Sequence, residues 1–370
     1  AVHRFNGFVY LYVTLYVDKK SSIFDGSRRN VTNGHVPGSI EMDWLPIFFV
    51  GVMGFALFVY TVLDGYDLGI GMLLPLAKDN DKDRMIATIG PFWDANETWI
   101  VLGVGVLLMA FPKAHGIVLT ALYAPVTIML IGLTLRGVAF DFRVKAKTEY
   151  KQTWNFLFFA GSFAAASAQG WMLGRYVMGL AQTPIATGFS IAIAILLPVL
   201  YIMLGAGWLL VKTEGELYKL AAKWARWFVL PLGLGLFMIS IATPIASASI
   251  AAKWFSLPEA IGLLPIPVAS LVAYVVVVWV LWTPKMLDAD FGWIIYVALI
   301  VLCVMCTLGL AYSIFPDVVL GQMTIWEAAA STESLQFAFY GTVIAVPAIF
   351  IYTVFIYRVF SGKTTELSYE

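Results

Sequence analysis

Apolar runs of about twenty residues follow one another from Met42 onward, separated by short polar segments. Each run is long enough to cross the ~30 Å hydrocarbon core of a membrane as a helix. The pattern therefore predicts an all-α polytopic membrane protein with about nine transmembrane helices. The predicted spans cover residues 44–73, 93–111, 117–136, 154–178, 186–211, 226–246, 261–282, 291–314 and 336–358.

Residues 1–41 differ in composition from the rest of the chain. A short apolar piece, too brief to span a membrane, is followed by polar residues that include Lys19, Lys20, Arg28 and Arg29. The segment lacks the long apolar region and small-residue cleavage site of a signal peptide. We interpret it as a polar leader or extension and expect it to be disordered and dispensable. Residues 42–370 are predicted to form a single transmembrane helical domain.

The overall composition supports a membrane protein. Hydrophobic residues make up 61% of the chain and charged residues 12%, whereas about 25% of a soluble domain is charged. The formal net charge is zero, so nothing indicates binding to nucleic acid. Because all predicted loops are short, any catalytic chemistry must lie within the membrane or on another subunit.

The loop cations predict the orientation of the chain. Most Lys and Arg of the predicted loops lie on one side of the membrane, and only Lys113, Arg175 and Lys253 fall on the other. The cation-rich side of a membrane protein faces the cytoplasm. We therefore expect the Met42 end to lie outside and the C-terminus to lie in the cytoplasm.

Two carboxylates occur inside the first predicted span. Asp64 and Asp67 are three residues apart, so they lie on one side of a helix, about 60° from each other around its axis. Each costs roughly 2.5–3.5 kcal/mol to insert at membrane depth. Gly65 and Gly69 form a small-residue pair that allows another helix backbone to approach. The two acids are candidates for a proton or ion path; the alternative is a structural contact that pins two helices together.

A second pair of acids, Asp94 and Glu97, opens the next span. Acids in a first helical turn favour the positive end of the helix dipole, which accounts for Asp94 better than for Glu97. By the predicted orientation, all four acids lie toward the cytoplasmic side. A series of carboxylates of this kind can hold and pass protons. We therefore expect a proton path through Asp64, Asp67, Asp94 and Glu97, with a purely structural network as the alternative.

The third span ends in Arg136, Asp141 and Arg143. Arginines around an aspartate at a membrane interface usually form ion pairs that anchor the end of the helix. A less common use is to bind a lipid headgroup or the propionate of a neighbouring haem. We expect interface, lipid or propionate anchoring at these three residues.

Histidine is scarce, and none occurs in the middle of a predicted span. His3 and His35 lie in the leader, and His115 lies in a turn between two apolar runs. Because His is the usual ligand for haem iron and metals at such depth, we expect this chain to ligate no metal or haem.

Three sequence blocks resemble subunit II of cytochrome bd-type ubiquinol oxidases, with some features of the cyanide-insensitive branch. They are Asp64-Gly65-Tyr66-Asp67-Leu68-Gly69-Ile70-Gly71, Trp93-Asp94-x-Asn96-x-x-Trp99 and Arg136-x-x-x-Phe140-Asp141-Phe142-Arg143. The resemblance covers essentially all of residues 42–370. It implies two four-helix bundles plus one peripheral helix.

The resemblance also implies a function. Such oxidases reduce O2 to water with electrons from quinol, using haem b and haem d in subunit I. This chain would then be the haem-free partner of subunit I in the bacterial inner membrane, with no catalytic residue of its own. It would contact membrane lipids and, in some complexes, a small single-span subunit. Acids matching Asp64, Asp67 and Asp94 are linked to proton supply, and the Trp matching Trp99 lies near a proposed O2 entry.

The sequence departs from the family pattern at two positions. Phe92 stands where some members have His, and Glu97 stands where some have Gln, so a proton role of that His does not carry over and Glu97 could compensate. A rival interpretation is a proton-coupled secondary transporter. Transporters usually contain broken helices at matching places in two repeats, and the sequence shows no such symmetry.

Overall fold

The computed structural model describes residues 44–364, apart from the side chains of residues 144, 148 and 259. These residues belong to one compact unit, Asp43–Glu370. Residues 1–41, for which the sequence predicts a leader, lie outside the described part of the chain.

The described chain is almost entirely helical. The long helices are α2 (Trp44–Leu73), α4 (Trp93–Ala110), α5 (Pro112–Lys145), α6 (Thr148–Val177), α7 (Pro184–Lys212), α8 (Gly215–Ala246), α11 (Pro265–Trp282), α13 (Trp293–Ile314) and α15 (Thr332–Val359). The short elements are η1 (Leu74–Leu76), α3 (Asp79–Ala87), α9 (Ala248–Phe255), α10 (Glu259–Leu263), α12 (Pro284–Asp288), β1 (Asp317–Val319), β2 (Met323–Thr324) and α14 (Ile325–Ala328).

Eight helices within residues 44–364 are long and apolar enough to cross a membrane, which confirms the predicted all-α polytopic class. The remaining predicted span corresponds to α4, an 18-residue helix about 27 Å long at 1.5 Å per residue. Its first two turns carry Asp94, Asn96 and Glu97, and the helix is too short to contain an apolar stretch of membrane length that excludes them.

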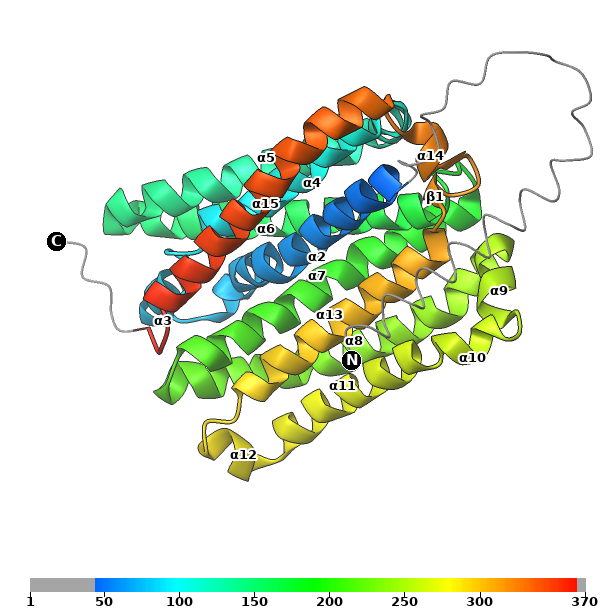
Figure 1. Cartoon of the computed structure of the whole chain (residues 1–370). Helices are drawn as coiled ribbons and strands as arrows, with labels where there is room; N and C mark the ends of the chain where they lie inside the picture. Colours follow the sequence, from blue (N-terminus) through cyan, green and yellow to red (C-terminus); the bar gives the residue numbers. More distant parts are fainter. Residues whose placement is uncertain (1–43, 365–370) are drawn as a thin grey trace, which may run out of the picture. The chain divides into compact units, whose positions relative to one another are not determined.

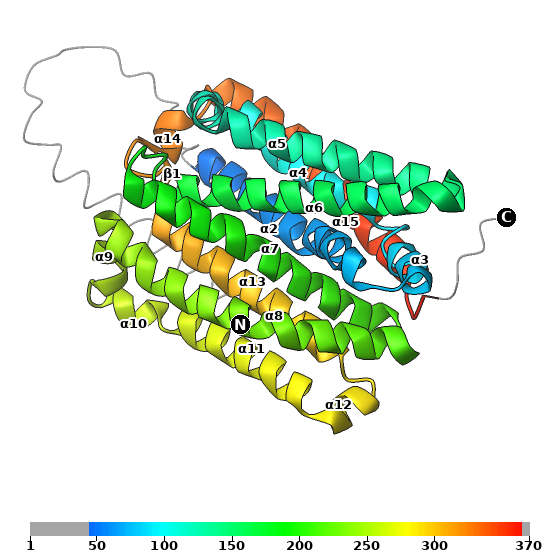
Figure 2. The same cartoon turned by 180° about the vertical axis from the view of Figure 1, so that it is seen from behind.

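The long helices form two groups of four. Helices α2, α4, α5 and α6 contact one another, and α7, α8, α11 and α13 form the second group. Helices α2 and α6 pack on α7 and connect the groups, while α15 lies along α4 and α2 at the outside of the first (Figure 1). Figure 2 shows α8 and α11 at the opposite edge from α5. This is the arrangement of two four-helix bundles plus a peripheral helix.

Helices α2 and α7 cross at a glycine pair. A Cβ added at Gly69 would lie 1.8 Å from the carbonyl oxygen of Tyr201, and one added at Gly205 would lie 2.7 Å from the backbone of Gly69. A Cβ at Gly65 would lie 2.9 Å from the Tyr201 ring. The predicted close approach of a second backbone beside the acids is therefore confirmed, and α7 is the helix that makes it.

Replacing Gly69 with Ala is expected to destabilise the protein, because the added methyl group meets backbone atoms that cannot move independently of the helix. Overpacking of this kind costs about 1–3 kcal/mol, or more where backbone is involved. The measurement is the thermal midpoint of the detergent-solubilised protein. Gly54→Ala on the same helix is the matched control, since nothing lies within 4 Å of its added Cβ. Equal midpoints for the two variants would contradict the close crossing.

Candidate functional site

Asp64 and Asp67 lie inside the first bundle. Both side chains are 0% exposed. Their spacing of three residues places them on one side of α2, as the sequence predicts. Asp64 faces α5 and Asp67 faces α4, because each binds a residue of that helix. The two acids therefore have different partners although they share a helix face.

Arg136 of α5 joins two carboxylates. Its Nη1 donates a 2.6 Å hydrogen bond to Asp64 Oδ1, and its Nη2 donates a 2.5 Å bond to Glu97 Oε1. Arg136 is 2% exposed and the Glu97 side chain 27% exposed. Charge-assisted bonds of this length are strong, and they offset the cost of burying the three ionisable groups. The triad runs from a partly accessible carboxylate to a fully buried one.

Asp67 has an uncharged partner. Asn96 Nδ2 donates to Asp67 Oδ2 at 2.8 Å and also lies 2.9 Å from the hydroxyl of Tyr66. The hydroxyl of Tyr357, on α15, donates to Asn96 Oδ1 at 3.0 Å. The Tyr66 and Tyr357 hydroxyls are 2.5 Å apart. Three helices, α2, α4 and α15, thus contribute to the surroundings of one carboxylate.

One oxygen of each aspartate lacks a partner. Asp64 Oδ2 and Asp67 Oδ1 are buried and have no donor at hydrogen-bond geometry within residues 44–364, although the Tyr60 hydroxyl interacts with the Asp64 carboxylate. Buried polar atoms are nearly always hydrogen-bonded, so such an oxygen requires a proton of its own or a bound water. These two atoms are the positions in the cluster where a proton can bind without displacing an existing contact.

The structure does not bring Asp94 into this cluster. Asp94 is exposed on the outer side of α4, and no hydrogen bond or ion pair within residues 44–364 joins it to Asp64, Asp67 or Glu97. Its main-chain carbonyl accepts a 3.1 Å bond from the Thr98 hydroxyl. This position is consistent with the alternative reading of Asp94 as an acid at the start of a helix.

Trp99 is buried one helical turn beyond Asn96. Its Nε1 donates to Thr353 Oγ1 of α15 at 3.3 Å, and its ring meets Phe55 edge to face at 5.7 Å. Ala56 and Tyr60 of α2 complete its surroundings. Trp99 therefore packs α15 onto α2 and α4. Its predicted position near an O2 entry stays a prediction.

The arginines of the third span do not pair with the aspartate between them. Arg136 points inward to Asp64 and Glu97, while Asp141 is exposed. Arg143 is also buried; its Nη1 lies 2.7 Å from Asp83 Oδ1, and its Nε donates to Asn155 Oδ1 at 2.5 Å. Neither arginine therefore pairs with Asp141, because both donate to acceptors on neighbouring helices instead.

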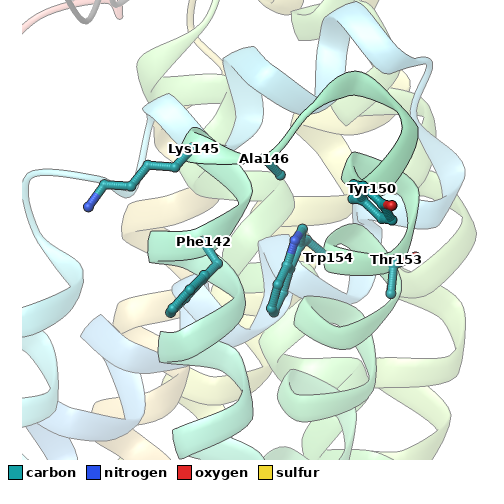
Figure 3. Close-up of a pocket in the computed structure, with 6 residues that line it drawn as sticks. All are labelled: Phe142, Lys145, Ala146, Tyr150, Thr153 and Trp154. Atoms are coloured by element: carbon teal, nitrogen blue, oxygen red, sulfur yellow. The ribbon is translucent and has the colours of Figure 1, made fainter.

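A shallow hollow of about 290 Å³ lies at the junction of α5 and α6 (Figure 3). Phe142 and Trp154 stack across it with ring centroids 5.3 Å apart. Tyr150 and Thr153 complete one wall, and the Lys145 side chain extends away from it. The lining is mainly apolar and lies next to Asp141 and Arg143. Lipid anchoring near these residues stays a prediction, and the hollow is separate from the buried acids.

Histidine, the usual haem ligand, is scarce among residues 44–364. His115 is the single His within residues 44–364 and lies in the first turn of α5. Among the usual iron ligands, the hollow offers only Tyr150. No group of three or more His, Cys, Asp or Glu side chains in the described ranges could hold a metal ion.

Sequence reasoning missed the residues that connect the acids to distant helices. Tyr357 lies 261 positions from Asn96, and one tyrosine near the end of a long apolar helix gives no local signal. Gln169 bridges Tyr60 and Tyr201 through two 2.7 Å bonds. A signal existed for Gln169, since an amide inside the small-residue run of α6 must find partners.

Together these features define a polytopic helical membrane protein with ionisable side chains gathered inside one of two helix bundles. A family model described as cytochrome bd terminal oxidase subunit II matches residues 45–360. This match covers most of the chain, so the protein belongs to the cytochrome bd terminal oxidase subunit II family.

Individual relatives agree with this assignment. Cytochrome bd-I ubiquinol oxidase subunit 2 of Escherichia coli K12 is 24% identical over 376 residues, which cover 90% of this chain and 98% of the relative. Cytochrome bd ubiquinol oxidase subunit 2 of Bacillus subtilis 168 is 34% identical over 156 residues, 41% of this chain and 42% of the relative. A solved structure of bd oxidase from Geobacillus thermodenitrificans has the same fold, with a TM-score of 0.63, 18% identity and coverage of 83% of this chain and 97% of that one.

Proposed function

We propose that the chain is the haem-free subunit II of a bacterial quinol oxidase and that its buried acids supply protons from the cytoplasm for the reduction of O2 to water. Membership of the bd family supports a haem-bearing partner subunit and a quinol substrate. Haem b and haem d in that partner would supply the electron transfer and the O2 chemistry. The contribution of this chain would be proton supply and support of the partner.

The observation that carries the proposal is the buried cluster of Glu97, Arg136 and Asp64, with Asp67 beside it. Glu97 is the most accessible member of the cluster and is suited to receive a proton from outside the chain. Asp64 and Asp67 each keep one buried oxygen free to bind a proton. Acids at membrane depth are functional candidates by default, and a partly accessible acid leading to buried ones is the arrangement that proton uptake requires.

Arg136 would not carry protons itself, because a guanidinium does not release its proton in a protein. Its role is to hold Glu97 and Asp64 at fixed positions and to compensate their charge. The cytoplasmic origin of the protons rests on the loop cations, most of which lie on the side where α2 ends and α4 begins.

Further partners follow from the family resemblance and from the exposed apolar surface. The oxidase-type resemblance supports contact with a small single-span subunit in some complexes. Exposed apolar side chains along α4, such as Val101 and Leu108, and along α5, such as Ile131, provide surface for lipids or for the partner subunit. A proton-coupled transporter is not favoured, because the family match covers residues 45–360.

The test is an absorption spectrum of the complex purified through a tag on this chain. We expect haem b and haem d bands together with a co-purifying second chain. A colourless single chain would contradict the proposal and favour the transporter. Separating the two chains in mild detergent without denaturation is the control for haem location: the haem should stay with the second chain, and haem retained by this chain alone would refute its haem-free role.

A further inference from the structure

The hydrogen bonds around Asn96 form a closed ring. The single hydroxyl proton of Tyr357 goes to Asn96 Oδ1. The 2.5 Å bond between the two tyrosine hydroxyls must then use the proton of Tyr66. Tyr66 in turn accepts from Asn96 Nδ2. The second proton of Nδ2 goes to Asp67 Oδ2. Every donor in the ring is therefore used once.

The ring could also close in the opposite sense. If the Asn96 carboxamide turned over, Nδ2 would donate to Tyr357, Tyr357 to Tyr66, and Tyr66 to Oδ1. Asn96 Oδ1 would then face Asp67 Oδ2, and the contact would survive only with a proton on Oδ2. The orientation of one amide thus decides which oxygen of Asp67 can carry a proton.

A main-chain carbonyl of α2 makes the two orientations of the Asn96 amide unequal in energy. The carbonyl oxygen of Leu63 lies 3.4 Å from Asn96 Nδ2. Both Nδ2 protons already go to Tyr66 and Asp67, so the Leu63 carbonyl shares one of them in the observed orientation, whereas a turned amide would place two acceptor oxygens against each other. The Leu63 carbonyl therefore favours the orientation in which the Tyr357 hydroxyl donates to Asn96 Oδ1.

We propose that Tyr357 is a positioning residue that fixes the Asn96 carboxamide, keeps Asp67 Oδ2 as an acceptor and leaves Oδ1 as the oxygen that binds and releases a proton. A proton from the aqueous phase forms the O–H bond at Oδ1, and Oδ2 becomes the carbonyl oxygen that still accepts from Asn96. On release, both oxygens share the negative charge. The inference rests on the proposed role of Asp67 in proton supply.

Contacts at the end of α15 hold Tyr357 in position beside Asn96. Lys212 at the end of α7 donates to the carbonyls of Phe360 and Gly362 at 2.6 and 2.9 Å. The Tyr357 ring also packs on Phe92, with centroids 4.6 Å apart. The position of the Tyr357 hydroxyl beside Asn96 is therefore fixed by the end of α15, which is itself hydrogen-bonded to α7 of the second bundle.

Other ionisable groups also act on Asp67 and have to stay constant in a test. From α2, α4, α5, α13 and α15 these are Asp64, Tyr66, Glu97, Arg136, Tyr296 and Tyr357. A Tyr→Phe substitution removes one hydroxyl and leaves all carboxylates and the guanidinium in place. Such a substitution therefore tests the hydrogen-bond ring without changing the charges around Asp67.

The test is infrared difference spectroscopy of the purified complex between acidic and alkaline pH, in the carboxylic C=O region. The band of protonated Asp67 is identified by its loss in Asp67→Asn. In Tyr357→Phe we expect this band at higher wavenumber, because the amide is released and the C=O group loses its N–H donor. In Tyr66→Phe we expect it at the wild-type position, since Tyr357 still donates to Asn96 Oδ1. Tyr352→Phe, an exposed position on the same helix, is the control for α15.

Each outcome bears on one claim. An Asp67 band that stays in place in Tyr357→Phe, or that moves equally in Tyr66→Phe, would overturn the positioning role. If every carboxylic band of the wild-type spectrum is still present in Asp67→Asn, then Asp67 does not take up a proton. That result would contradict the proposed proton supply. Thermal midpoints and haem spectra identify any variant that fails to assemble. If Tyr357→Phe fails to assemble, Asn96→Ser takes its place, because it removes the bond from Asn96 to Asp67 Oδ2. The Asp67 band is then expected to shift to higher wavenumber. An unshifted band in Asn96→Ser would overturn the inference.

Discussion

Replacing Arg136 with Met is expected to remove most of the assembled protein from the membrane. The substitution keeps a long side chain but leaves the carboxylate of Asp64 buried without its cation and frees Glu97 from α5. Removing one partner of a buried ion pair costs about 3–5 kcal/mol, a large part of the stability of most folded proteins. The measurements are the amount of complex in membranes and its thermal midpoint.

Two comparisons separate charge from packing in this experiment. Arg143→Met is the matched control, since its partner Asp83 is 53% exposed and water can solvate the freed carboxylate. We expect a smaller loss there. Adding Asp64→Asn and Glu97→Gln to Arg136→Met removes the unpaired charges and should restore part of the stability. Wild-type levels of the single Arg136 variant would show that the triad contributes little to the fold.

Replacing Asp67 with Asn is expected to slow quinol-driven O2 consumption strongly while leaving assembly intact. The amide has nearly the same shape, and its oxygen can still accept from Asn96 Nδ2. It cannot bind and release a proton, and the loss of a positioned acid or base typically costs roughly a hundredfold in rate or more. The measurement is O2 consumption by membranes, normalised to haem content, across a range of pH.

The position of Asp94 provides the control for this effect. Asp94 is exposed and bonded to none of the other acids in the described chain, so Asp94→Asn should change turnover little. As an acid at a helix start, it contributes roughly 0.3–1 kcal/mol of local stability. Wild-type turnover of Asp67→Asn at every pH would leave the buried acids as structural contacts only.

Local sequence patterns determined the class of fold and the position of the acids along it. Apolar runs of membrane length predict spanning helices because the hydrocarbon core requires satisfied backbone hydrogen bonds and apolar side chains over a fixed thickness. The spacing of Asp64 and Asp67 predicts a shared helix face from the helical repeat alone. The glycines beside them predict a close helix crossing, and Gly69 makes one against Gly205.

Only the tertiary structure decided which groups the acids bind. The sequence placed Arg136 at an interface with Asp141, whereas the packing of α5 on α2 and α4 turns it inward to Asp64 and Glu97. The same holds for Tyr357, which reaches Asn96 from a helix far along the chain. Hydropathy and helical period fix where a side chain lies on its own helix. The rotation and depth of one helix against another depend on the fit of all their side chains together, and that fit determines which acid meets a cation and which meets an amide.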